Sequence, residues 1–166
     1  MKKIVFLMFI IFLIVIMSTK NNQILIPNEA IRIRVIPNSN DLNDQKLKSD
    51  IKNEVSNYLY NKISNVDNYE DANKIIAVNL NNINAIVGKH TDDFNIYYGS
   101  NYFPKKNYKG VNYGEGKYKS LVIKLGEAKG DNFWCVLFPP LCSIDEKKFD
   151  GAKYKLYVSK LLNKIK

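Results

Sequence analysis

The stretch AIRIRVIPNSNDLNDQKLKSDIKNEV, residues 30–55, changes its hydrophobic period halfway along. Between Ile31 and Val35, apolar residues alternate with arginines, which predicts a strand with one wet face. Residues 37–41 end that strand, and from Leu47 onward apolar side chains recur at every fourth position. This second spacing predicts an amphipathic helix of about five turns. The stretch therefore predicts a fold that contains both strands and helices.

The remainder of the chain continues this mixture. A second helical pattern occupies residues 69–87, and Gly88 follows it as a C-terminal stop. Strand-like runs and a last, basic amphipathic helix then come at residues 94–99, 117–127, 133–138 and 154–165. Strand, two helices, several strands and a helix in this order predict an α+β domain, with helices packed on one face of a mainly antiparallel sheet.

The first twenty residues form a separate segment. Lys2 and Lys3 are followed by fourteen apolar residues, 4–17, a length that suits the core of a signal peptide better than a membrane span. We expect residues 1–20 to be an export signal, either removed or kept as a short membrane anchor. Residues 21–29 are then a linker, and residues 30–166 are a single α+β domain.

The charge of the chain argues against nucleic acid as a partner. The chain has 25 basic and 16 acidic side chains and a net charge of +9, yet its only arginines are Arg32 and Arg34. Arginine is the usual residue for bidentate contacts to phosphates and bases, so a lysine-rich surface disfavours sequence-specific binding. We expect a solvated surface, with weak attraction to an anionic membrane surface or wall as the alternative.

The residues needed for catalysis are scarce. A Cys-His or Ser-His-Asp arrangement would have to use the single histidine, His90, and a thiol mechanism would add Cys135 or Cys142. Two cysteines and one distant histidine also lack the short paired spacings of zinc sites. We expect no enzyme activity, metal, cofactor or small-molecule substrate. The alternative is an exported cell-wall-modifying hydrolase or a thiol acyltransferase that uses Cys135 and His90.

The segment GEAKGDNFWCVLFPPLC, residues 126–142, contains the only tryptophan and both cysteines. In an exported protein, two cysteines favour a disulfide between Cys135 and Cys142, and the two prolines allow the chain to turn back. Two buried free thiols are the alternative. The aromatic residues are equally compatible with a core and with a binding hot spot. The sequence pattern alone does not decide between a core role and a binding role for these aromatic residues.

Three motifs carry a resemblance to a known family. The runs GDNFWCVLFPPLC (130–142), IRIRVIPNSNDLNDQKLK (31–48) and YFPKKNYKGVNYGEGKYKSLVIKLGEAKGDN (102–132) resemble the stage II sporulation protein R family of endospore-forming bacteria. Phe133 stands where the family commonly has tryptophan, Pro37 replaces an alanine, and Asn40 replaces an aspartate. The resemblance covers about residues 31–145.

This resemblance implies a signalling protein rather than an enzyme. Such a protein is made in the forespore and exported into the space between the forespore and mother-cell membranes. There it triggers a membrane-embedded aspartic protease, which removes the pro-sequence of an inactive sigma factor. On this basis we expect four residues to contact the partner or shape the contact, and four to be polar partners: Trp134, Phe138, Pro139 and Pro140, and Arg32, Arg34, Asn38 and Asp131.

Overall fold

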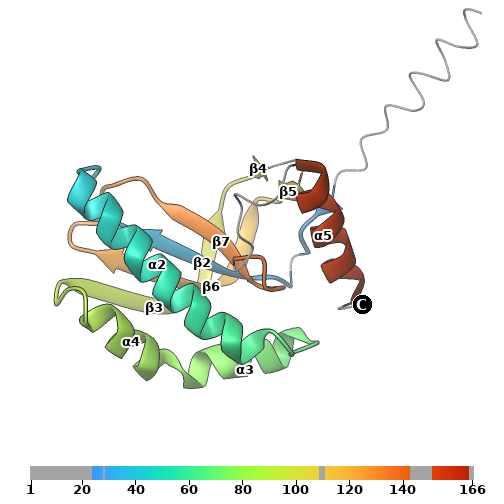
Figure 1. Ribbon diagram of the computed structural model, residues 1–166, viewed down its shortest axis with the longest axis horizontal. Coiled ribbons are helices and arrows are strands. Elements are labelled where there is room, and N and C mark those ends of the chain that lie inside the picture. Colours follow the sequence, from blue (N-terminus) through green and yellow to red (C-terminus); the bar gives the residue numbers. More distant parts are fainter. Residues whose placement is uncertain (1–23, 28, 109–110, 143–150, 165–166) are drawn as a thin grey trace, which may run out of the picture.

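The computed structural model describes residues 24–27, 29–108, 111–142 and 151–164 (Figure 1). Its main sheet has four strands in the order β3-β6-β2-β7. They are β2 (Ile31–Ile36), β3 (Phe94–Phe103), β6 (Gly116–Leu125) and β7 (Phe133–Phe138). The central strand β2 runs parallel to β6 and antiparallel to β7, and β3 is antiparallel to β6. The predicted α+β class with a mainly antiparallel sheet is confirmed.

Three helices cover one face of this sheet, as Figure 1 shows: α2 (Leu42–Ile63), α3 (Tyr69–Val78) and α4 (Leu80–Gly88). The main core, which lies between these helices and the sheet, is aliphatic apart from Phe138. The sequence predicted one helix where the structure has α3 and α4, divided at Asn79. The Asn79 side chain donates to the Ile75 carbonyl at 2.8 Å and accepts from the Tyr58 hydroxyl at 2.5 Å. Such local side-chain bonds compete with the regular helical ladder.

A second, smaller sheet was not predicted. It consists of β1 (Ile24–Leu25), β5 (Val111–Tyr113) and β4 (Lys106–Tyr108), in that order. Helix α5 (Gly151–Lys164) packs beside β1, and Figure 1 shows α5, β4 and β5 together at one end of the main sheet.

This second sheet corrects the predicted linker at residues 21–29. Residues 24–27 belong to the folded domain, because β1 pairs in parallel with β5 and the Ile26 amide donates to the Asn112 carbonyl at 3.0 Å. Ile26 itself is only 1% exposed. The pairing joins residues far apart in the sequence, so no local pattern reveals it.

The second sheet and α5 also close a second core, against the face of the main sheet opposite α2. Its buried members are Ile26, Ala30, Phe103, Val111, Tyr118, Val136, Leu141 and Val158. Arg32 was predicted to lie on a wet face, but it is 3% exposed because this layer covers it. Arg34, on the same face of β2, is partly exposed.

The predicted export segment, residues 1–20, lies outside the described residues. Within the part of the chain that the structure describes, no helix has both the length and the apolar character required to cross a membrane.

Candidate functional site

Strand β7 divides its aromatic residues between the two cores. Phe133 packs against the main core and Trp134 against the second core, as alternation along a strand requires. Phe138 also joins the main core, because the pairing of β7 with β2 shifts register between Ile31 and Arg32. Of the side chains that the sequence left undecided, Phe138 is therefore a buried core residue, whereas Phe133 and Trp134 are partly buried and pack against opposite cores.

A disulfide joins Cys135 and Cys142, with their Cα atoms 5.6 Å apart. The turn through Pro139 and Pro140 brings the two cysteines together, and the Cys142 amide donates to the Val136 carbonyl at 3.2 Å. The sequence prediction of a disulfide is confirmed. Neither sulfur is a free thiol, so a thiol mechanism at Cys135 lacks its nucleophile in this structure.

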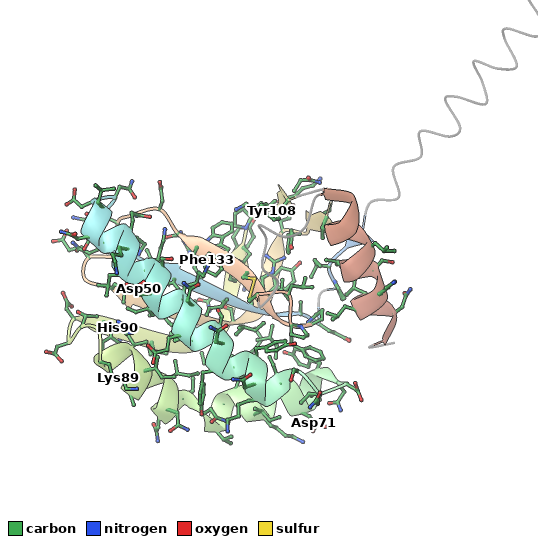
Figure 2. The ribbon with its side chains drawn as sticks, in the orientation of Figure 1. Asp50, Asp71, Lys89, His90, Tyr108 and Phe133 are labelled. Carbon is green, nitrogen blue, oxygen red and sulfur yellow. A yellow bond between two sulfur atoms is a disulfide. The ribbon has the colours of Figure 1, made fainter. Side chains whose placement is uncertain are left out.

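Trp134 lies at a pocket of about 180 Å³ between the main sheet and the second sheet. Figure 2 labels Phe133 and Tyr108, two of the residues that line it. The lining residues are Arg32, Phe103, Lys106, Tyr108, Tyr113, Asn132, Phe133, Trp134, Cys135 and Val136. The pocket is therefore walled by aromatic rings and carries two cationic side chains.

Arg32 is the buried cation of this pocket. Its Cζ lies 3.7 Å from the centroid of the Tyr118 ring and 4.9 Å from that of Phe103. Its Nη2 donates to the Gly114 carbonyl at 3.2 Å. Burial lowers the pKa of the Arg32 guanidinium, and the neighbouring Tyr118 and Tyr113 oppose that shift. An arginine nevertheless stays protonated in proteins, so the pocket holds a permanent positive charge.

The Trp134 indole lies near one other aromatic ring and two cationic side chains. It meets the Phe103 ring edge-on, with centroids 5.8 Å apart. The Arg34 Cζ lies 5.4 Å from its centroid, and the Lys106 Nζ 5.7 Å. With the Asn132 amide oriented so that its oxygen faces Arg34, that oxygen accepts from the Arg34 Nε at 3.1 Å and Nη2 at 2.6 Å. Arg34 is thereby fixed beside the indole, which remains partly exposed.

Asn38 and Asp131, predicted as polar partners, lie elsewhere, in a clasp formed by residues 37–48 and 126–131. The Asn38 Nδ2 donates to Asp44 Oδ2 at 3.0 Å, and its Oδ1 accepts from the Glu127 amide at 3.0 Å. The Asp131 amide donates to Asn40 Oδ1 at 2.6 Å, and hydrogen bonds from Ser39 and Asn38 lower the pKa of the Asp44 carboxyl. Within the clasp these groups hold the loop after β6 against the start of α2.

Two glycines make this close approach possible. Gly126 has φ +53°, a conformation that favours glycine, and a Cβ there would meet the Asn38 side chain at 2.5 Å. A Cβ on Gly130 would collide with the Ser39 carbonyl oxygen. Two of the motifs that resemble the family therefore meet in one structural feature.

The remaining predicted residues divide by burial. Phe138 is 1% exposed and Pro139 is buried, whereas Pro140 is partly exposed. As a whole, the predicted set falls into three groups: Trp134, Arg32 and Arg34 around the pocket, Phe138 to Pro140 in the core and the turn, and Asn38 and Asp131 in the clasp. Their contact roles stay predictions.

His90 lies apart from the pocket. It follows α4, and its Nε2 lies 2.8 Å from the Glu54 carboxylate on α2. Figure 2 shows His90 well separated from Tyr108 of the pocket. Across the described residues, no group of three or more His, Cys, Asp and Glu side chains is arranged to hold a metal ion.

The pocket also contains residues that sequence analysis missed: Phe103, Lys106, Tyr108, Tyr113 and Asn132. Four of these belong to residues 101–116, for which the sequence predicted no strand. The tyrosines and lysines gathered in that stretch were the available signal. Only the packing of the second sheet against β7 shows that these residues line a pocket.

Comparison with known proteins agrees with the motifs. The family model for stage II sporulation protein R matches residues 27–148. The chain belongs to the stage II sporulation protein R family. It is 32% identical over 142 residues to the stage II sporulation protein R of Bacillus subtilis (strain 168), an alignment that covers 82% of this chain and 63% of that protein. No solved structure matches the chain. Membership of the family supports a role associated with sporulation.

The matched residues include β2, the whole of the clasp, the pocket and the disulfide-closed turn. Helix α5 begins after the match ends. The match thus covers the main sheet, its three helices and the residues around Trp134, and it ends before the C-terminal helix.

Proposed function

We propose that this chain is an exported sporulation signal. It activates a membrane-embedded aspartic protease, and the protease then removes the pro-sequence of an inactive sigma factor in the mother cell. The observation that carries this proposal is the family match over residues 27–148. In this account the chain supplies no catalytic group, and residues 1–20 take the domain across the forespore membrane.

To activate the protease, this chain must bind the active state of the protease more tightly than the inactive state. A ligand that moves a two-state protein from mostly inactive to mostly active must prefer the active state by about 5 kcal/mol. Binding of that strength commonly depends on a few aromatic or arginine anchors that each contribute about 2 kcal/mol or more. The domain must therefore present at least one such anchor to the protease.

Trp134 is the best candidate for that anchor. It is partly exposed and its ring is fixed by Phe103, so little conformational freedom is lost on binding. Arg34 and Lys106 lie within 6 Å of the same ring and add positive charge around it. Together these three residues form a rigid aromatic surface with a cationic rim.

The other predicted contact residues have indirect roles in this account. Phe138 and Pro139 are buried, so they shape the turn rather than touch the protease. Asn38 and Asp131 fix the clasp, which sets the position of the loop that leads into β7. Pro140 is partly exposed and remains a candidate for direct contact.

Co-expression tests the proposal. The full chain is produced in a non-sporulating bacterial host together with the candidate protease and its sigma precursor, and processing is followed by immunoblot. We expect the shortened sigma factor only when all three proteins are present. A protease with its catalytic aspartates replaced is the control and must leave the precursor intact. Intact precursor in the presence of exported, folded chain and active protease would contradict the proposal.

A further inference from the structure

Two residues that line the pocket each have a buried hydrogen-bond donor without a partner. The Arg32 Nε and the Trp134 Nε1 are both buried, and neither has a hydrogen-bond partner in the described part of the chain. Both residues line the same pocket, whereas Ser56, which has the third such atom, lies on α2. Leaving a buried donor unpaired destabilises the folded protein. Guanidinium and indole N–H groups can only donate, so the missing partner is an acceptor.

The charge of the pocket indicates what kind of acceptor fits. Among the residues that the structure describes, Arg32 and Lys106 line it, and no Asp or Glu does. Because low-dielectric surroundings strengthen electrostatic interactions, an anion there gains more than a neutral carbonyl. The aromatic walls favour a singly charged carboxylate over a phosphate, which carries more charge to be desolvated.

The size of the pocket restricts its occupant further. Its volume of about 180 Å³ far exceeds the roughly 10–15 Å³ that one water molecule needs. It also lies below the roughly 300–1,000 Å³ that is usual for small-molecule sites. The space suits a single side chain or a chain end.

We propose that this pocket binds one carboxylate of the protein partner, from an acidic side chain or from a C-terminus. Trp134 Nε1 and the Arg32 guanidinium donate to it, and Lys106 contributes charge at the mouth. Since both unpaired nitrogens are buried, the carboxylate enters as a wall side chain rotates aside, and the exposed Lys106 is the least constrained of these. That the protease supplies this carboxylate rests on the proposed function. That the pocket binds a carboxylate rests only on the residues around it.

The single tryptophan of the chain makes a direct test possible, because its indole N–H gives one NMR resonance. The full chain, kept in a neutral detergent, is titrated with N-acetylglutamate N-methylamide as a side-chain mimic and with N-acetylglycine as a chain-end mimic. We expect a saturable downfield shift with one of these acids, and its identity tells the two sources apart. The matching neutral amides should bind about tenfold more weakly. Equal responses to acid and amide, no shift with either acid, or tighter binding of inorganic phosphate would overturn the proposal.

A pair of lysine variants adds a second readout. Lys106→Met removes the charge at the mouth of the pocket and should weaken binding of the acid by about twofold to fivefold. Lys74→Met makes the same change on α3, on the other side of the sheet, and should leave the affinity unchanged. Equal affinities for the two variants would place the acid elsewhere on the protein.

The titration contains no protease, so its outcome is separate from that of the co-expression test. A chain that binds the acid at Trp134 but fails to induce processing contradicts the proposed function alone. If the chain induces processing but its indole N–H resonance does not shift when carboxylates are added, only the pocket proposal is contradicted.

Discussion

The main core beneath α2, α3 and α4 is aliphatic apart from Phe138, whereas the second core, on the opposite face of the same sheet, surrounds a buried arginine with aromatic rings. A buried cation is costly unless rings and hydrogen bonds compensate for its lost hydration. In the second core, aromatic rings and the Gly114 carbonyl compensate Arg32 in part, and two buried donors without a partner among the described residues and a pocket remain. We propose a division of work, in which the helix-covered face stabilises the domain and the opposite face recognises a partner.

The largest expected effect lies in the main core. Leu59 on α2 is 0% exposed there, so Leu59→Ala should lower the free energy of unfolding by about 2–5 kcal/mol. Urea unfolding followed by circular dichroism measures the change. Processing activity should fall only as far as the folded fraction falls. A loss well under 1 kcal/mol would mean that this face does not carry the stability assigned to it.

Removing the disulfide should have the next largest effect. A bridge that closes so short a loop stabilises by about 2–3 kcal/mol, mainly by restricting the unfolded chain. The paired change Cys135→Ala with Cys142→Ala should lower the free energy of unfolding by that amount. Wild type measured in a reducing agent should match the variant, and wild type that keeps its full stability under reduction would contradict the role of the bridge.

The smallest expected effect concerns the clasp and appears as a pH dependence. Hydrogen bonds from Ser39 and Asn38 hold the pKa of Asp44 below its ordinary value near 4. A carboxyl with a depressed pKa in the folded state adds stability above its unfolded pKa, and that stability is lost as the pH falls through the folded pKa. Asp44→Asn should therefore be less stable than wild type at pH 7, and this difference in stability should disappear as the pH falls below about 4.

Thermal unfolding at a series of pH values measures this gap. Ser39→Ala removes the strongest of the hydrogen bonds to Asp44, so it should shrink the pH dependence without abolishing it. A stability difference between wild type and Asp44→Asn that stays constant from pH 7 to pH 2 would show that the Asp44 charge does not stabilise the clasp.

The sequence predicted the main sheet and its helices because their patterns are local. Alternation in β2 and fourfold spacing in α2 each show within one element. The break at Asn79 was missed because an asparagine within an apolar period does not by itself end a helix. It does so here because its side chain bonds both Tyr58 and the Ile75 carbonyl.

The second sheet and the pocket could not be predicted from such patterns. β1 has two residues, and its pairing with β5 joins positions 24 and 111. Arg32 looked solvent-exposed because the layer that buries it comes from distant segments. Asn38 and Asp131 were predicted to be polar partners of the protease, and their hydrogen bonds place them in the clasp. No local feature of the sequence separates that structural role from partner binding.

One comparison of two variants tests the division of work most directly. Trp134→Ala removes the proposed anchor, and Tyr60→Ala removes an exposed aromatic ring from α2 on the opposite side of the sheet. Sigma-factor processing in the co-expression host is measured for each, per amount of exported and folded chain. We expect Trp134→Ala to weaken activation by roughly 30-fold, as the loss of about 2 kcal/mol implies, and Tyr60→Ala to behave as wild type. Normal processing by folded Trp134→Ala, or an equal loss in both variants, would contradict the account.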